Sequence, residues 1–348
     1  MDATLRLNQM PSPTWNRLKV NEAVERGFAA AKEPFEEKKV PGGVSFEQKK
    51  ETAFPDQKTG AGEEVQKTVT SSNIPARSFV FENSKENEPL YIELPATENK
   101  SALLPIELSV KAGSKGVAVM FFTCEDDEEV EQCVQTKYEV LAGASLTLIQ
   151  IISLSKKSRL ISDIGGKVEE NGKFHLIQLV LKGGQIDLGA LSDLSGKKSS
   201  LETDIVYLTG QDEVLDINEI ANHIGKNTNS LIRVNGVLSE NGKKTFRGTI
   251  DLRRGAKGAV GTETEEVLLM DDGVVNRSVP VILCTEEDVE GNHGATIGKI
   301  DQDTLFYLES RGIPEEMIYD MLSRAVVDSI KKKIGDEATI KRIDELTR

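Results

Sequence analysis

The side chains in this sequence that are best suited to chemistry are its few histidines and cysteines. They are His175, His223, His293, Cys124, Cys133 and Cys284. Imidazole and thiolate groups are common ligands of transition metals. Cys124 and Cys133 are separated by eight mostly acidic residues, which is not a zinc-binding spacing. These two thiols therefore do not predict a metal site.

His293 has the most unusual surroundings of the three histidines. It lies in EGNHGATIGKID between Gly291 and Gly294, and small neighbours allow a partner or ligand to approach the backbone closely. A neutral imidazole can bind iron, but one histidine cannot hold a metal or a cluster without other ligands. His293 therefore either contributes to a site shared with other groups or hydrogen-bonds within its own turn. His175 is expected in a strand, and His223 in a hydrogen-bonded turn.

Motifs for the common catalytic mechanisms are missing. The nearest string to a phosphate-binding loop, LSGKKS from Leu194 to Ser199, lacks the first glycine and the spacing of G-x-x-x-x-G-K-[ST]. The sequence contains no G-x-S-x-G elbow and no H-E-x-x-H zinc motif. We therefore expect no enzymatic activity and no ATP hydrolysis by this chain.

The composition indicates which classes of binding partner can be excluded and which cellular compartment is expected. Lys and Arg total 43 against 57 Asp and Glu, which gives a formal charge of −14 and no electrostatic reason to bind nucleic acid or an anionic membrane. The N-terminus lacks the apolar stretch of a secretory signal. The most apolar run, Leu146 to Leu154, is too short to span a bilayer. With three sparse cysteines, the sequence predicts a cytoplasmic protein in a reducing compartment.

The first 77 residues are expected to lie outside the main domain. Residues 1–34 contain VNEAVERGFAAAKEPF, where Val20, Ala23, Val24 and Phe28 are spaced as on one side of a short helix. Residues 35–77 are rich in Lys, Glu, Gly, Pro, Ser and Thr and have no periodicity. Such a segment buries little apolar surface, so it is interpreted as a linker or a loosely held strap.

Residues 78–300 are expected to form a β-rich core. Short β-rich runs such as SFVF, GVAVMFF, KFHLIQLVL and KTFRGTIDL alternate with Gly, Asn or Asp turns, and the turns recur at intervals of roughly 30 residues. No amphipathic helix separates the strands, which argues against a βαβ fold. Stacked coils of parallel strands are favoured slightly over an antiparallel sandwich or barrel, because strand direction is not visible in the sequence.

Residues 301–348 are expected to be helical. Asp301 is a candidate N-cap for a helix that ends at Gly312, and Pro314 followed by acidic residues favours the start of a second helix. A stripe at helical spacing on this second helix consists of Met317, Met321, Leu322, Ala325 and Ile330. EATIKRIDELT favours a third, short helix. The stripe either packs on the chain's own core or binds a partner.

The stretch from Asn222 to Ile334 resembles the SufB/SufD family of the SUF iron–sulfur cluster assembly system. Asn222-His223-Ile224-Gly225 and the following NSLIRVNGVLSENGKKTFRGTIDL are similar to the β-helix core of that family. The run from His293 to Asp301, HGATIGKID, followed by LFYL and SRGI, carries the most specific likeness. Near the N-terminus, PTWNRLKVN is similar to the SufD signature.

The details within the resemblance favour the SufD form. SufB-like sequences have His-Glu-Ala-Thr where this chain has His293-Gly294-Ala295-Thr296. The cluster-building cysteine of SufB corresponds to Val274, and a cysteine that many SufD proteins carry before the motif histidine corresponds to Gly291. Cys284 does not fill that position and is expected to be a buried strand cysteine.

The resemblance implies a mainly β protein, with a right-handed parallel β-helix followed by a C-terminal helical region. It implies a scaffold that pairs with a SufB-type paralogue and docks a SufC-type ATPase. A transient iron–sulfur cluster is expected at the SufB–SufD interface, with His293 as the candidate ligand and no tightly bound cofactor in the isolated chain. The residues expected to dock the ATPase are Tyr307, Arg311, Pro314, Met317, Met321, Leu322 and Ala325.

Two alternatives belong to other classes of protein. One is a stand-alone homodimer that binds SufC without SufB, and the isolated chain is itself a candidate homodimer. The other is a carbohydrate-active β-helix enzyme, which would need paired carboxylates in a groove and is usually secreted. The lack of a signal sequence and the helical C-terminal region count against this enzyme.

Overall fold

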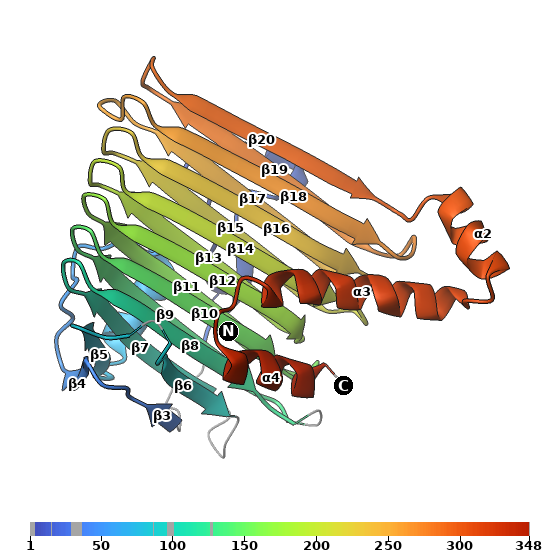
Figure 1. The fold of residues 1–348 in the computed structure, drawn as a ribbon, viewed down its shortest axis with the longest axis horizontal. Coiled ribbons are helices and arrows are strands. Elements are labelled where there is room, and N and C mark those ends of the chain that lie inside the picture. The colour runs from blue at the N-terminus through green and yellow to red at the C-terminus, as the bar shows by residue number, and fades with distance from the viewer. Residues whose placement is uncertain are drawn as a thin grey trace.

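The computed structural model describes residues 4–14, 16–28, 37–85, 87–95, 101–125 and 128–347. Within these ranges the chain forms a parallel β-helix with helices at its C-terminal end (Figure 1). Two sheets of nine strands each make the walls of the β-helix, and from β5 (Ala76–Phe81) onward consecutive strands along the chain alternate between them. This confirms the mainly β prediction and its stacked coils.

The strands of the two walls are short at the first end of the β-helix and nine or ten residues long from β7 (Ser101–Val110) onward. The first sheet consists of β3 (Glu37–Lys39), β6 (Leu90–Pro95), β8 (Lys115–Thr123), β10 (Ser145–Ser153), β12 (Lys173–Lys182), β14 (Ser200–Thr209), β16 (Asn229–Leu238), β18 (Val260–Leu269) and β20 (Glu290–Gly298). The second sheet consists of β4 (Val44–Lys49), β5 (Ala76–Phe81), β7 (Ser101–Val110), β9 (Glu131–Val140), β11 (Arg159–Val168), β13 (Gln185–Leu194), β15 (Val214–His223), β17 (Lys243–Leu252) and β19 (Val275–Cys284). A separate antiparallel ribbon is formed by β1 (Thr4–Leu7) and β2 (Ala23–Arg26).

The register of the strands confirms the repeat expected from the sequence. In the first sheet, Ser145, Lys173, Ser200, Asn229 and Val260 occupy the same position in successive coils. Neighbouring strands from β5 to β20 are parallel, which requires a new coil for each return to the same sheet. Only β3 and β4, at the first end of the β-helix, pair antiparallel with the wall. The chain's own antiparallel strands therefore cover the edges at this end.

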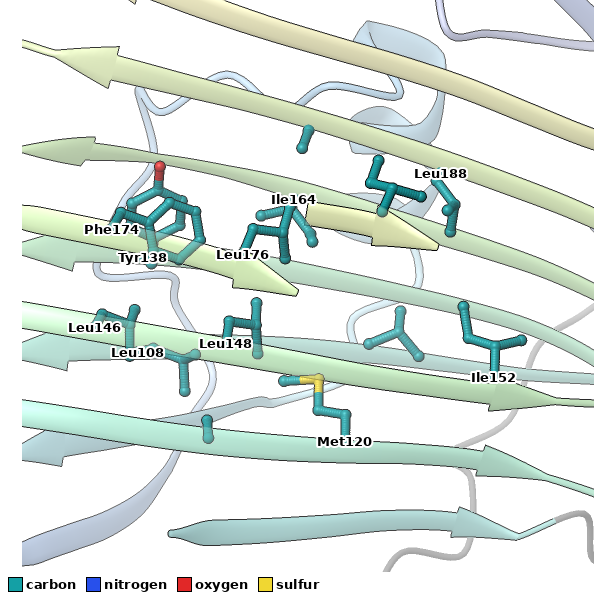
Figure 2. Close-up of a cluster of buried hydrophobic side chains, with 14 of the residues drawn as sticks. Leu108, Met120, Tyr138, Leu146, Leu148, Ile152, Ile164, Phe174, Leu176 and Leu188 are labelled. Carbon is teal, nitrogen blue, oxygen red and sulfur yellow. The ribbon is translucent and has the colours of Figure 1, made fainter. Parts of the chain in front are cut away.

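The interior is filled by side chains that alternate inward along each strand. Figure 2 shows part of this core, where Leu148 and Leu176 lie in register on neighbouring strands above Met120. The rings of Tyr138 and Phe174 stack with centroids 3.9 Å apart across the interior. Stacked apolar rows of this kind exclude water and supply most of the stability of the β-helix.

The turns between coils occur at the Gly and Asn positions where the sequence predicted turns, and several of these residues adopt the left-handed conformation. Gly143 and Asn171 have φ angles of 66° and 54°, and Asn241 has 65°. Glycine and asparagine adopt this conformation at little steric cost, so these turns end the strands at equivalent positions in successive coils.

The N-terminal prediction was wrong in the described residues. Residues 23–26 form strand β2 instead of a helix, and the only helical turn in residues 4–14 and 16–28 is the 3₁₀ segment Asn16–Leu18. Val24 is 55% exposed, so the apolar residues that suggested a helical face do not bury a common stripe. Backbone pairing with β1 outweighs the weak helical pattern of this short segment. Residues 15 and 29–36 lie outside the described residues.

The interpretation of residues 35–77 as a loosely held segment was also wrong. The segment contains helix α1 (Glu63–Ser71), and its preceding loop is buried against the second sheet. The backbone N–H of Ala61 donates to Asp163 Oδ1 at 2.8 Å, and Asn218 Nδ2 donates to the carbonyl of Gly60 at 2.9 Å. Buried polar side chains of the sheet hold this loop by hydrogen bonds, and composition alone does not reveal such partners.

Three C-terminal helices follow β20, as predicted: α2 (Gln302–Ser310), α3 (Glu315–Lys331) and α4 (Glu337–Leu346). The Asp301 carboxylate caps α2 by accepting from the Thr304 N–H at 2.8 Å, and Asp336 caps α4 in the same way. Helix α3 crosses the outer face of the first sheet, as Figure 1 shows. None of the helices in the described part of the chain has the length and apolarity needed to cross a bilayer.

Candidate functional site

His293 lies on β20, the last strand of the first sheet, and its side chain is exposed. In the parallel register it is paired with Glu263 of β18, whose side chain points into the β-helix. Because paired residues of parallel strands face the same side, His293 projects at the open end of the interior. Among the described residues, His293 belongs to no group of three metal-ligand side chains. Any metal held by this imidazole needs ligands from elsewhere.

The end of the β-helix around His293 is open. No further coil follows β19 and β20, so both are edge strands, and every described residue of β20 up to Ile297 is exposed. Ile297 itself is 43% exposed. An uncovered row of backbone N–H and C=O groups is a template for pairing with another chain. This end differs from the first end, where β3 and β4 cover the wall.

The other two histidines lie within hydrogen-bonding distance of neighbouring side chains. His223 is fully buried, and its Nδ1 and Nε2 lie 2.8 Å from the hydroxyl oxygens of Thr228 and Ser230. Burial lowers the pKa of His223 to about 4, so its imidazole is neutral at neutral pH. His175 lies on β12 with Nε2 2.8 Å from Asp204 on β14. The predictions of a strand position for His175 and of hydrogen bonding for His223 are confirmed, but His223 is the last residue of strand β15 and not part of a turn.

His175, Glu202 and Asp204 form the one group of metal-ligand side chains found in the described residues, yet cations of the chain already surround it. Arg233 donates to both carboxylates, and Lys333 Nζ lies 2.8 Å from Asp204 Oδ1. Although burial opposes ionisation, hydrogen bonds from His175, Arg233 and Lys333 hold the pKa of Asp204 well below its usual range. This cluster attaches the segment that follows α3 to the sheet, and its carboxylates are already paired with cations of the chain.

The position of Cys284 corrects the prediction of a buried strand cysteine. Cys284 ends β19 and is exposed, with its Sγ 3.1 Å from the carbonyl oxygen of Glu286. It pairs in register with Leu252 of the preceding coil, but no later coil covers it. Of the two positions at which the resemblance indicated a missing thiol, Gly291 is exposed on β20 and Val274 packs against the core. The open end thus carries one thiol, at a position the resemblance did not indicate.

The predicted docking residues lie on α2, on α3 and in the connection between them, and α2 and the start of α3 extend beyond the C-terminal ends of the first-sheet strands (Figure 1). Tyr307 on α2 and Met317 and Met321 on α3 are 54%, 54% and 53% exposed. Arg311, Pro314 and Ala325 are also exposed, and Leu322 is half-buried. The guanidinium of Arg311 lies 5.1 Å from the centre of the Tyr307 ring. The structure therefore places most of these side chains on free surface.

The two halves of α3 have different surroundings. Val327 and Ile330 in the second half are buried against Ile149 and Ile177 of the first sheet. Leu322 and Ala325 line a groove beside the ends of β16, β18 and β20. The predicted stripe therefore divides: Ile330 belongs to the packed face, whereas Met317 and Met321 do not contact the sheet core.

Phe306 was not among the predicted docking residues, although it is 73% exposed on α2. Helix α2 has no buried residue and contacts α3. A nine-residue helix is only marginally stable without packing against other elements. The aromatic side chains of α2 are nevertheless exposed. The neighbouring aromatic pair in LFYL was the signal in the sequence. We call Phe306, Tyr307, Met317 and Met321 the apolar helix patch.

Sequence reasoning also missed a row of charged side chains inside the last coils. Glu219 on β15, Lys244 on β17, and Glu263 and Glu265 on β18 are each at most 4% exposed. Lys244 forms a buried ion pair with Glu265. Burial, with the nearby charge of Glu265, raises the pKa of Glu263 to about 7. The interior beneath His293 is thus polar and acidic, unlike the apolar interior of the earlier coils.

The raised pKa of Glu263 predicts a pH-dependent stability. Because its folded-state pKa of about 7 exceeds the unfolded value of 4.5, its stabilising contribution is present below pH 4.5 and is lost as pH rises to about 7. Glu263→Gln should remove this loss and raise the free energy of unfolding above pH 7 by at most about 3 kcal/mol. Denaturant unfolding at several pH values measures it. Glu266→Gln, an exposed change on the same strand, should alter neither the free energy of unfolding nor its dependence on pH. Equal pH profiles of unfolding for wild type and Glu263→Gln would contradict the prediction.

The match to a known family covers most of the β-helix. The family model described as "SUF system FeS cluster assembly, SufBD core domain" matches residues 96–326. An iron–sulfur cluster assembly SufBD family protein of Mycobacterium tuberculosis is 30% identical over 144 residues, which is 41% of this chain and 17% of that protein. The matched region runs from the early coils through the open end and most of α3.

The similar proteins include both SufD and SufB proteins. The iron–sulfur cluster assembly protein SufD of Escherichia coli is 24% identical over 230 residues, 66% of this chain and 54% of that protein. The corresponding SufB of Bacillus subtilis is 27% identical over 147 residues, 42% of this chain and 32% of that protein. The alignments thus span 54% or less of the length of these curated relatives.

Proposed function

Since the chain belongs to the SufBD family of SUF-system iron–sulfur cluster assembly proteins, we propose that it is a SufD-like scaffold subunit of that machinery. The observation that carries the proposal is the family match to residues 96–326, which includes the β-helix, the open end and the start of the C-terminal helices. In this role the chain supplies shape and surfaces, and partner chains supply nucleotide chemistry.

The proposed SufB-type partner pairs at the open end of the β-helix. The free edges of β19 and β20 support this, because edge strands join sheets by main-chain hydrogen bonds. The interface would bring His293 beside thiolates of the partner. The nascent iron–sulfur cluster is cargo in this scheme, and His293 contributes one neutral imidazole to hold it. His293-Gly294-Ala295-Thr296 and the absence of a thiol at Val274 favour the SufD type over the SufB type.

The proposed SufC-type ATPase docks on the apolar helix patch. Exposed aromatic and methionine side chains are characteristic of binding surfaces, and α2 and the first half of α3 hold them clear of the β-helix. ATP-driven motion of the docked ATPase would then act on α3, which crosses the first sheet and ends at the Asp204 cluster. The chain itself does not hydrolyse ATP in this proposal, and it works in the cytoplasm.

Mixing the purified chain with a SufB-type and a SufC-type protein tests the proposal. The expected product contains this chain, one SufB-type chain and the ATPase in a single complex, as measured by native mass spectrometry. The chain alone should hydrolyse no ATP above background. A stable homodimer that binds the ATPase and ignores the SufB-type protein would replace the proposal by the stand-alone scaffold, and failure to bind either protein would reject both.

A further inference from the structure

The last coils of the β-helix contain more negative than positive charge in their interior. Glu219, Glu263 and Glu265 are 2%, 4% and 3% exposed, and Lys244 is the cation inside this part of the described chain. Lys244 pairs with Glu265 and lies 3.4 Å from the Ser278 hydroxyl. The charge of Lys244 also acts on Glu263, so one ammonium group serves both Glu263 and Glu265, and Glu219 forms no ion pair among the described residues. Buried carboxylates without counter-ions are strongly unfavourable.

The two carboxyl groups are neighbours across the interior. Glu219 pairs in register with Gly248 of the next coil. A Cβ atom at Gly248 would overlap the carboxylate of Glu263, so this carboxylate crosses from the first sheet to lie over the Gly248 backbone. Gly248 thus provides the space that brings Glu263 next to the coil of Glu219. Burial raises the pKa of Glu219 well above its usual range, and the Glu263 charge adds to this effect.

One unpartnered polar atom belongs to this pair, and a second lies nearby, close to Glu265. Glu219 Oε1 is buried and has no hydrogen-bond partner among the described residues. The hydroxyl of Tyr207 is also buried without a partner in the described part of the chain, and the charge of Glu265 contributes to raising its pKa. Tyr207 reaches this region because Gly236 of the next coil leaves room for its ring. A buried oxygen that lacks a partner calls for a bound group to satisfy it.

We propose that Glu219 and Glu263 form a binding site for a divalent transition cation inside the last coils of the β-helix. Carboxylate oxygens, with hydroxyl groups or water completing the shell, suit Mn(II) and Fe(II). Because burial favours the protonated form of both carboxyl groups, one such ion would displace their protons and take up the buried oxygens as ligands. The site lies one coil inward from His293, so a cation reaches it through the open end of the interior. The proposal rests on these interior residues and does not require a SufB or SufC partner.

Mn(II) is a suitable probe, because free and bound Mn(II) are distinguished by electron paramagnetic resonance. The intact chain, freed of metals by chelation, is titrated with Mn(II) at about pH 8, above the usual carboxyl range. Wild type should bind about one ion per chain and melt at a higher temperature when loaded. Glu263→Gln and Glu219→Gln, which keep the side-chain shape, should each weaken binding at least about tenfold and remove the thermal shift.

Two matched variants serve as controls for the titration. Glu266→Gln makes the same chemical change on the exposed face of β18 and should bind Mn(II) as wild type does. His293→Ala should also retain binding, because His293 lies outside the carboxylate pair. The proposal is overturned if wild type binds no Mn(II), if Glu263→Gln and Glu219→Gln bind it as tightly as wild type, or if His293→Ala alone abolishes binding. None of these results bears on ATPase docking, so this proposal and the proposed function fail separately.

Discussion

Changing Met317 and Met321 together to aspartate should abolish docking of a SufC-type ATPase. Both side chains are more than half exposed on the first half of α3, beside the exposed aromatics of α2. Two carboxylates placed in an apolar interface would be desolvated without partners. Interface hot spots cost at least about 2 kcal/mol when truncated, so a loss of at least about 100-fold in affinity is expected for this double charge insertion. Isothermal titration of the ATPase measures it.

The control for this experiment is Ala338→Asp, an apolar-to-aspartate change on the exposed side of α4. It should leave the affinity unchanged. Point substitutions are preferable to removing the chain after Gly312, because deletion of α3 and α4 would uncover the apolar outer face around Ile149 and Ile177. The docking proposal is wrong if Met317→Asp/Met321→Asp retains its circular dichroism spectrum and binds the ATPase as wild type does.

The β-helix could be predicted because its signals are local. Glycine and asparagine turns recur once per coil, and positions such as Asn171 and Asn241 adopt the left-handed conformation that their side chains tolerate. The absence of helices between strands excluded βαβ units. The C-terminal helices were equally predictable, since Asp301 caps its helix as expected.

The polar interior of the last coils could not be predicted. Alternate residues of a strand point to opposite faces of the sheet, but the sequence does not show which of the two faces points into the β-helix. In the run TETEE of β18, Glu263 and Glu265 share one face and the threonines share the other. Only the register with β16 and β20 places the glutamates inside. Charged residues at alternate strand positions are usually interpreted as solvent-facing, and here that interpretation fails.

The remaining differences arise from contacts that are distant in sequence. Cys284 has a strand-like context, but its exposure depends on the absence of a following coil. The segment around Gly60 lacks apolar periodicity, yet Asp163 and Asn218 of distant strands hold it by hydrogen bonds. On α3 the helical spacing was correct, but the start of the helix extends beyond the C-terminal ends of the strands, so Met317 is exposed while Ile330 is buried.

His293→Ala should reduce iron–sulfur cluster formation by the complex without weakening its assembly. The side chain is exposed on an edge strand and supports no described packing, so its removal should leave the β-helix intact. Loss of one ligand that orients or holds a metal typically costs about 10- to 100-fold in affinity, and a fall in cluster yield of about tenfold is expected. His223→Ala is unsuitable as a control, because that imidazole is buried and hydrogen-bonded to Thr228 and Ser230.

The most direct test of the scaffold account is anaerobic reconstitution of the three-protein complex with wild type and with His293→Ala. Iron and acid-labile sulfide are measured per complex, after native mass spectrometry has shown that both complexes contain the same chains. The account predicts equal masses and a much lower cluster content for His293→Ala. Equal cluster content in the two complexes would contradict the role of His293 at the interface, and a wild-type chain that joins no complex would contradict the account as a whole.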